Sequence, residues 1–133
     1  MYEFQRLTRE VRLLARRYEC CRLSEVGKSL CGRPLYLLRV GSGEIPVLYA
    51  GAFHGLEGIT AALLVHFCRR LCQAQESGLT VYGVPVRPLL ERCTLYCVPM
   101  VNPDGVEIAL SGEQAAGDYG PICAGKTHRG QAN

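Results

Sequence analysis

The sequence predicts an α/β fold, in which helices flank a mixed, mainly parallel sheet. Residues 3–17 place apolar side chains at helical spacing between charged ones, the pattern of an amphipathic helix. Residues 46–51 and 93–99 are apolar runs of strand length, and a long helical pattern at 57–75 separates them. A strand, a crossover helix and a second strand in this order form a right-handed βαβ unit, which predicts that the two strands are parallel.

The remaining elements follow from local patterns. Residues 19–26 and 34–40 predict the two strands of a hairpin, because a turn-rich segment joins them. The run at 46–51 is apolar along its whole length, so we expect it to be a buried central strand. Residues 85–91 predict a short helix that a proline opens. Residues 111–133 are rich in glycine, alanine and small polar residues and show no periodicity, so no element is predicted there.

Length and composition limit the class of protein. The 133 residues are enough for about one domain, and 48% hydrophobic with 20% charged residues is the balance of a globular protein. The net charge of +3 is small and the basic residues are scattered, so a nucleic-acid partner is not expected. No apolar stretch reaches the roughly 18–20 residues that span a membrane. The N-terminal residues show no signal-peptide pattern, which predicts a cytoplasmic location by default and leaves an extracellular one open.

The chain contains eight cysteines, and none of them forms a CxxC pair. Cys68 and Cys72 lie in the long helical pattern, and Cys93 and Cys97 lie in a predicted strand. We interpret both pairs as small buried hydrophobic residues. Reduced thiols are therefore expected, rather than a zinc ribbon or a thioredoxin-like motif.

Two loops follow the strands of the βαβ unit, and a site in such a sheet belongs at the carboxyl ends of its strands. The first loop contains His54 and, three residues later, Glu57. Imidazole and carboxylate are good zinc ligands, and a catalytic zinc needs three protein ligands and a water. In a simpler interpretation, Glu57 is a first-turn acid that stabilises the helix. Glycines around the pair favour the metal site, because they let backbone approach it closely.

The second loop contains Asn102, Pro103, Asp104 and Gly105, a run with strong turn chemistry. One interpretation is a tight turn that closes the crossover. The other is that the turn shapes the rim of the site that the first loop builds. The residues alone leave both interpretations open.

In this order and spacing, the motifs resemble the zinc carboxypeptidase family related to pancreatic carboxypeptidase A. The resemblance rests on the His54–Glu57 motif after a strand, a long helix, a second strand and the segment 99–105. The opening helix, followed by 27–29 (Gly-Lys-Ser) and 32–34 (Gly-Arg-Pro), is also similar. The similarity is greatest to the bacterial branch with γ-D-glutamyl-diamino-acid peptidases, which act on cell-wall peptides. It implies a zinc-carboxypeptidase/phosphorylase-like fold.

The resemblance implies a zinc-dependent peptidase, which hydrolyses a peptide or γ-D-glutamyl amide bond with a zinc-activated water. His54 and Glu57 would be the first two zinc ligands, and a histidine from a later strand would be the third. That histidine, the general-base glutamate and the Asn-Arg pair that holds the substrate carboxylate lie downstream of residue 133 in the family pattern. The chain is therefore expected to be the N-terminal part of a single catalytic domain, truncated on its C-terminal side. It is expected to have no catalytic residue and no peptidase activity by itself.

Residues outside the two loops add little to the predicted site. His128 lies in a segment of loop composition and His66 on the helix away from its main apolar face, so neither is expected to bind zinc. Arg129 is a candidate for contacting the substrate or its oxyanion. Leu56 stands where many eukaryotic members place a substrate-contacting arginine, so it favours the bacterial branch. Strand edges left without partners predict self-association.

Two other functions fit some of the same residues. Zinc amidohydrolases such as succinylglutamate desuccinylase and aspartoacylase also use a His-Gly-x-Glu motif, but the segment 102–105 argues for the peptidase. A non-catalytic binding domain with the same fold would share every residue. The expected partner is a peptide substrate, with a cell-wall peptide as the specific candidate, and the expected cofactor is one zinc ion.

Overall fold

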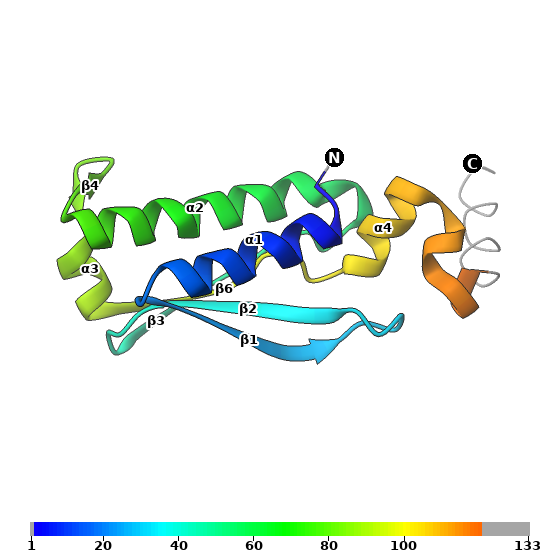
Figure 1. Cartoon of the computed structure of the whole chain (residues 1–133), viewed down its shortest axis with the longest axis horizontal. Helices are drawn as coiled ribbons and strands as arrows, with labels where there is room; N and C mark the ends of the chain where they lie inside the picture. Colours follow the sequence, from blue (N-terminus) through cyan, green and yellow to red (C-terminus); the bar gives the residue numbers. More distant parts are fainter. Residues whose placement is uncertain (1, 121–133) are drawn as a thin grey trace.

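Two long helices lie side by side on one face of a four-stranded sheet (Figure 1). The computed structural model describes residues 2–120. The layered part consists of α1 (Phe4–Arg17), β1 (Cys21–Lys28), β2 (Pro34–Gly41), β3 (Ile45–Ala50), α2 (Gly58–Ser77), α3 (Val86–Arg92) and β6 (Cys93–Val98). The smaller elements are a 3₁₀ turn η1 (Gly55–Glu57), a ribbon of β4 (Thr80–Val81) and β5 (Val84–Pro85), α4 (Pro103–Ser111) and a 3₁₀ helix η2 (Glu113–Tyr119).

The sheet has the strand order β1-β2-β6-β3 and is mixed, but it is mainly antiparallel. β1 pairs with β2, and β2 pairs with β6, in antiparallel register, whereas β3 and β6 are parallel. The α/β class and the βαβ unit are confirmed. The expectation of a mainly parallel sheet is wrong for residues 2–120, because the hairpin strand β2 takes the place beside β6. Only the two strands joined through α2 run parallel.

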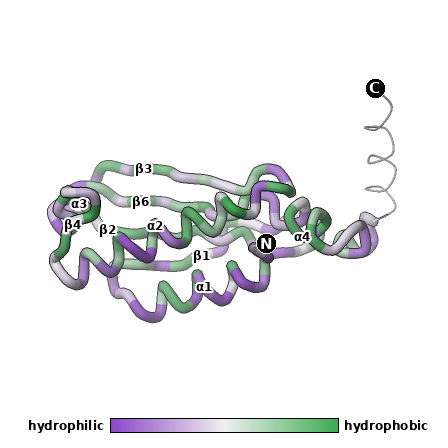
Figure 2. The backbone as a smooth tube through the Cα atoms, turned by 90° about the horizontal axis from the view of Figure 1, so that it is seen from above, coloured by the Kyte–Doolittle hydropathy of each residue, from purple (hydrophilic) through white to green (hydrophobic). Residues whose placement is uncertain are grey.

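β3 is an edge strand in the part of the chain that the structure describes, not the buried central strand that its composition predicted. β6 is its only partner there. Leu48 has 69% of its surface exposed and Tyr49 has 46%. Figure 2 shows β3 as the strand farthest from α1. Apolar composition shows what a strand is suited to pack against, whereas its burial depends on which neighbours are present. Self-association through this edge stays a prediction.

The core lies between the two helices and the sheet. α2 ends at Ser77 and is capped by Gly78, whose φ of +66° is the left-handed conformation that stops many helices. Cys68, Cys72 and Cys97 are buried and free, which confirms that they are core residues, whereas Cys93 is half-buried. α1 turns one apolar stripe inward, as its spacing predicted: Leu7, Val11 and Leu14.

The segment after β6 contains more helix than the sequence predicted. Residues 102–105 do not form an isolated turn but begin α4, with Asn102 as its N-cap and Pro103 in its first turn. η2 then occupies part of the region where no element was predicted. α3 confirms the short helix predicted at 85–91. Among residues 2–120, no helix is long and apolar enough to cross a membrane.

Candidate metal centre

The carboxyl ends of β3 and β6 lie together because the two strands are parallel neighbours. Backbone hydrogen bonds also join the loops that follow them. The Gly51 N–H donates to Val98 O at 3.1 Å, and the Val101 N–H donates to Gly51 O at 2.9 Å. The Asn102 N–H donates to Ala52 O at 3.0 Å. The two loops that were predicted to carry a site therefore form one continuous unit at this edge of the sheet.

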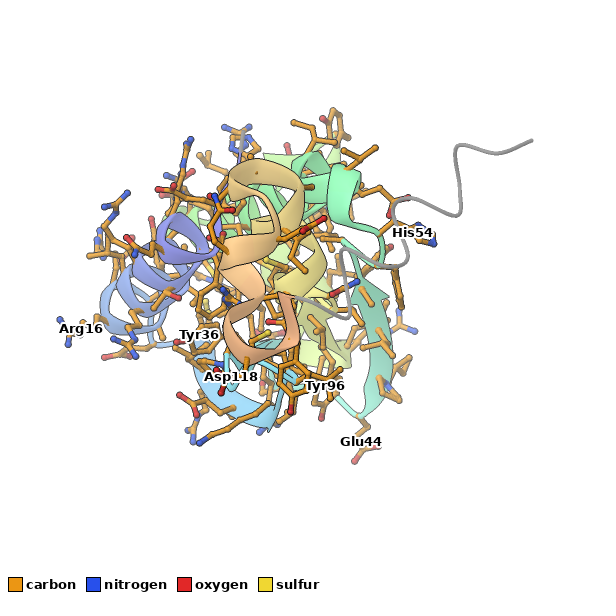
Figure 3. The ribbon with its side chains drawn as sticks, turned by 90° about the vertical axis from the view of Figure 1, so that its right-hand side faces the viewer. Arg16, Tyr36, Glu44, His54, Tyr96 and Asp118 are labelled. Carbon is orange, nitrogen blue, oxygen red and sulfur yellow. The ribbon has the colours of Figure 1, made fainter. Side chains whose placement is uncertain are left out.

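His54 and Glu57 lie side by side around the single turn η1. The His54 Nδ1 and Glu57 Oε1 atoms are 2.7 Å apart, and the His54 N–H donates to Glu57 Oε2 at 3.3 Å. Both side chains face solvent, with exposed fractions of 81% and 43%, and Figure 3 shows His54 pointing away from the body of the molecule. Hydrogen bonding from His54 holds the pKa of Glu57 below its usual value. An imidazole nitrogen and an ionised carboxylate thus meet at an exposed point, and zinc is bound by such donors.

The backbone just before His54 has an unusual conformation. Ala52 is fully buried and has a φ of +50°, in the left-handed region that residues other than glycine rarely adopt. Its N–H donates to Thr60 Oγ1 at 2.7 Å, and the Thr60 hydroxyl donates to Glu57 O at 2.8 Å. Thr60 therefore links the end of β3 to the turn that carries Glu57. No sequence pattern singles out Thr60, whose only signal is a hydroxyl in the first turn of the long helix.

A close approach at Gly55 fixes the His54 loop against the start of α4. A Cβ atom on Gly55 would lie 2.3 Å from the carbonyl oxygen of Gly105. A side chain does not fit in that space, so a glycine is needed for the two backbones to touch. Gly105 is crowded in turn, because a Cβ atom there would lie 2.6 Å from Asn102 Nδ2.

Asn102 connects the two loops through its side chain. Its Oδ1 accepts the Gly105 N–H at 2.8 Å, and its Nδ2 donates to Phe53 O at 3.1 Å. The first bond caps α4, and the second holds the residue next to His54. The segment 102–105 thus forms a wall beside the His54 loop. Its importance for a bound metal stays a prediction.

Asp104 fastens this wall to the β1–β2 hairpin. Its carboxylate accepts hydrogen bonds from the Ser29 hydroxyl at 2.8 Å, the Cys31 N–H at 3.0 Å and Arg33 Nη1 at 2.6 Å. Arg33 also donates to Ala115 O at 2.7 Å. Burial alone would raise the pKa of Asp104, but these donors outweigh it and hold the pKa below its usual value. Ser29 and Arg33 belong to the opening motif of the sequence, and no sequence pattern connects them with Asp104.

The other candidate residues from the sequence do not complete the metal site. His66 is exposed on α2, and Leu56, between the two candidate ligands, has 79% of its surface exposed. His128 and Arg129 lie outside the described residues. Within residues 2–120, no group of three histidine, cysteine or acidic side chains is placed to hold a metal. His54 and Glu57 therefore fit zinc as two ligands, and a third is not among the residues that the structure describes.

Comparison with known proteins agrees with the motifs. A family model for zinc carboxypeptidases matches residues 7–127. γ-D-Glutamyl-L-diamino acid endopeptidase 1 of Lysinibacillus sphaericus is 29% identical over 114 residues, which cover 86% of this chain and 29% of that protein. Carboxypeptidase D of Mus musculus is 31% identical over 120 residues, covering 75% of this chain and 8% of that protein. The chain thus spans less than a third of the length of these relatives.

Solved structures show the same architecture. A metallo-carboxypeptidase from Burkholderia cenocepacia aligns with a TM-score of 0.65 and 26% identity, over 79% of this chain and 28% of that one. Bovine thrombin-activatable fibrinolysis inhibitor, solved with a tick carboxypeptidase inhibitor, aligns with a TM-score of 0.69 and 20% identity, over 84% of this chain and 34% of that one. The second likeness concerns the fold alone. With a family model that matches most of its length, the chain belongs to the zinc carboxypeptidase family.

Proposed function

We propose that the chain forms the first metal-binding part of a zinc-dependent peptidase domain, with His54 and Glu57 as two of the zinc ligands. One observation carries this proposal: the 2.7 Å approach of His54 Nδ1 to Glu57 Oε1 where the ends of β3 and β6 meet. The family match over residues 7–127 supports zinc as the metal and hydrolysis as the reaction class.

Neighbouring residues of this chain hold and orient the two candidate ligands, His54 and Glu57. A bound zinc ion lowers the pKa of a water molecule and polarises the carbonyl that is attacked. Thr60 and Asn102 fix the loop around His54, and hydrogen bonding from His54 holds the pKa of Glu57 below its usual value. The exposed side of the pair leaves room for a third ligand from outside the described residues. With two ligands only, the isolated chain is expected to be inactive.

For the substrate, we propose a peptide with a γ-D-glutamyl amide bond, as found in cell-wall peptides. The similarity to the Lysinibacillus endopeptidase supports this choice. Leu56, which lies between the two candidate ligands in the sequence, is apolar and largely exposed, so this position offers no positive charge to a substrate carboxylate. An enzyme that recognises an ordinary C-terminal carboxylate would gain from a cation there.

A chimera tests the proposed function. This chain would replace the matching 114-residue segment of the Lysinibacillus endopeptidase, and hydrolysis of a γ-D-glutamyl-L-diamino acid peptide would be followed in the presence of zinc. We expect turnover by the chimera and none by the isolated chain. Glu57→Gln should lower kcat/KM of the chimera by at least about 100-fold, because it removes a charged ligand.

Glu44→Gln provides the matched control, since Glu44 is an exposed acid in the turn before β3 (Figure 3). It should leave kcat/KM of the chimera unchanged. Circular dichroism would establish that all variants fold. Turnover by the isolated chain, or equal activity of the Glu57→Gln and Glu44→Gln chimeras, would contradict the proposed function.

A further inference from the structure

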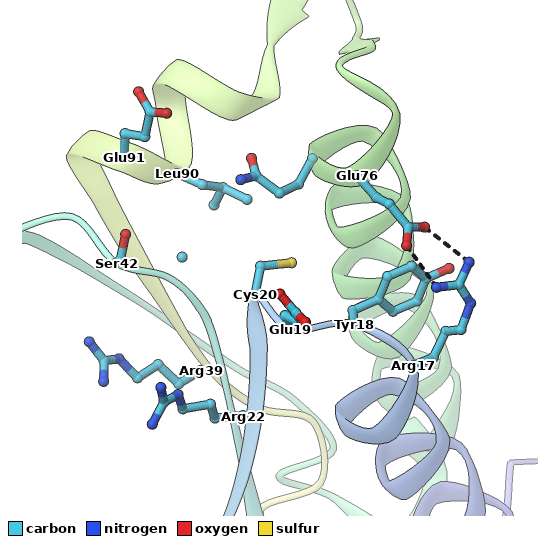
Figure 4. Close-up of a pocket in the computed structure, with 12 residues that line it drawn as sticks. Arg17, Tyr18, Glu19, Cys20, Arg22, Arg39, Ser42, Glu76, Leu90 and Glu91 are labelled. Carbon is cyan, nitrogen blue, oxygen red and sulfur yellow. Dashed lines mark hydrogen bonds and ion pairs between the residues drawn. The ribbon is translucent and has the colours of Figure 1, made fainter.

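A surface hollow lies at the other end of α2 from His54 and Glu57. α2 begins beside the His54 loop and runs along the sheet to the end where α1 meets β1 (Figure 1). There, residues from α1, the first two strands, α2 and α3 border a hollow of about 650 Å³ (Figure 4). This volume is within the range of sites that bind small molecules. Neither His54 nor Glu57 lines the hollow, so it is separate from the candidate metal centre.

Two arginines line the hollow at directly opposed positions of the sheet. Arg22 on β1 and Arg39 on β2 are partners in the antiparallel register, and Figure 4 shows their side chains side by side. Like charges at opposed positions of neighbouring strands destabilise a sheet. Neither guanidinium group has an ion pair with an acid among residues 2–120. The two groups therefore have donors available for an anion, and guanidinium binds a carboxylate through two parallel hydrogen bonds.

A buried acceptor without a partner belongs to the same hollow. The side-chain oxygen of Gln75, near the end of α2, is buried and has no hydrogen-bond partner among residues 2–120. Buried polar atoms are normally hydrogen-bonded, because an unpaired one costs free energy. Gln75 lines the hollow, so an N–H group of a ligand bound there can donate to this oxygen and remove that cost.

The acids around the hollow determine which kind of anion it suits. Arg17 donates hydrogen bonds to both carboxylate oxygens of Glu76, at 2.7 and 3.0 Å. Glu19 and Glu91 also line the hollow and have no ion pair among residues 2–120. Their charges disfavour a doubly charged anion such as phosphate and favour a ligand that also carries a positive charge. A short peptide combines a carboxylate, amide N–H groups and an ammonium group.

We propose that this hollow is a binding site for short peptides with free termini. The peptide carboxylate lies between Arg22 and Arg39, where two guanidinium groups share it. An amide N–H of the peptide donates to the side-chain oxygen of Gln75. The ammonium group faces the unpaired acids Glu19 and Glu91. Binding at this site does not depend on the proposed peptidase function.

Titration of the isotope-labelled, zinc-free 133-residue chain with trialanine, followed by nuclear magnetic resonance, tests this proposal. We expect a dissociation constant below about 1 mM, with the largest shifts at the amides of 18–22, 39–42 and 75–76. Trialanine amide lacks the carboxylate and should bind at least about tenfold more weakly. Inorganic phosphate should also bind more weakly than trialanine, because it has no positive charge to offset repulsion by the acids.

Four variants distinguish the roles of the lining residues. Arg22→Gln and Arg39→Gln should each weaken trialanine binding about tenfold, because each removes a charged donor. Arg16→Gln is the matched control, since Arg16 is an exposed arginine of α1 that does not line the hollow (Figure 3). It removes the same charge and should leave the dissociation constant unchanged. Gln75→Met removes the unpaired oxygen, so it should weaken binding at least about threefold without lowering the stability of the free chain.

Several results would overturn the proposal. Equal affinity for trialanine and its amide would show that the arginines do not bind the carboxylate, and so would unchanged binding by Arg22→Gln and Arg39→Gln. Tighter binding of phosphate than of trialanine would mean that the hollow binds anions in general. A dissociation constant above about 1 mM for trialanine would mean that the hollow is not a peptide site. The arginine variants alter exposed side chains, and the spectrum of each variant would show that it folds.

Discussion

Replacing Asp104 with alanine is expected to lower the free energy of unfolding by about 3 kcal/mol, because it leaves a partly buried cation without its partner. The Arg33 and Asp104 side chains are only 20% and 13% exposed, and their ion pair is 2.6 Å long. The same substitution removes the acceptor for the Ser29 hydroxyl and the Cys31 N–H. The hairpin turn would then separate from the start of α4, which forms the wall beside His54.

The Asp104→Ala variant should also respond less to acid than the unchanged chain. Because the pKa of Asp104 is lower in the folded state than in the unfolded state, its ionised form stabilises the fold. This contribution is fully present above about pH 5 and is lost as the pH falls below the unfolded-state pKa of about 3.9 and through the folded-state pKa. Urea unfolding measured between neutral pH and pH 3 should therefore show a shallower decline for the variant.

Glu76→Ala is the matched control, since Glu76 is the carboxylate of an exposed ion pair with Arg17. The Arg17 and Glu76 side chains are 62% and 50% exposed, and their closest atoms are 2.7 Å apart. Such surface pairs contribute less than about 1 kcal/mol, so the unfolding midpoint should hardly move. If Asp104→Ala and Glu76→Ala cost the same, the bonds around Asp104 do not fasten the hairpin to α4.

Gly55→Ala should destabilise the fold by about 3 kcal/mol and also move the candidate ligands. The added methyl group would lie 2.3 Å from Gly105 O, a backbone atom that cannot turn aside. The His54 loop must therefore shift away from α4, which stretches the Asn102 bond to Phe53 O. Urea unfolding would measure the loss of stability.

Gly27→Ala gives the comparison for Gly55→Ala, because it adds the same methyl group on the β1 strand. There the nearest atom would be Leu35 Cδ1 at 3.7 Å, an ordinary van der Waals contact. We expect a change in unfolding free energy within about 0.5 kcal/mol. Equal losses for the two glycines would mean that the contact between the site loop and α4 does not require a glycine.

The sequence predicted the elements whose patterns are local. The apolar stripe of α1, the long helix after His54 and the two apolar strands of the βαβ unit all appear in the structure. It could not predict which strand lies beside β6, because strand pairing depends on residues far apart in the chain. The exposed edge of β3 has the same cause, since an apolar run is compatible with a central or an edge position.

The proximity of the two candidate ligands was predictable from the sequence, whereas the contacts that hold their loop in place were not. His54 and Glu57 stand in one short motif, so their proximity follows from a single turn. The contacts of Asp104 with Ser29 and Arg33 join segments more than 70 residues apart, and no spacing rule relates them. The tight-turn interpretation of residues 102–105 missed α4, because proline and asparagine favour turns as well as helix starts.

X-ray absorption at the zinc edge tests the central claim, that His54 and Glu57 are zinc ligands. With one equivalent of zinc on the chain, we expect nitrogen and oxygen neighbours at about 2.0–2.2 Å, including an imidazole. His54→Ala should remove the imidazole signal, and His66→Ala, which alters an exposed histidine on α2, should preserve it. A sulfur shell at about 2.3 Å, or an imidazole signal that survives in His54→Ala, would contradict the account.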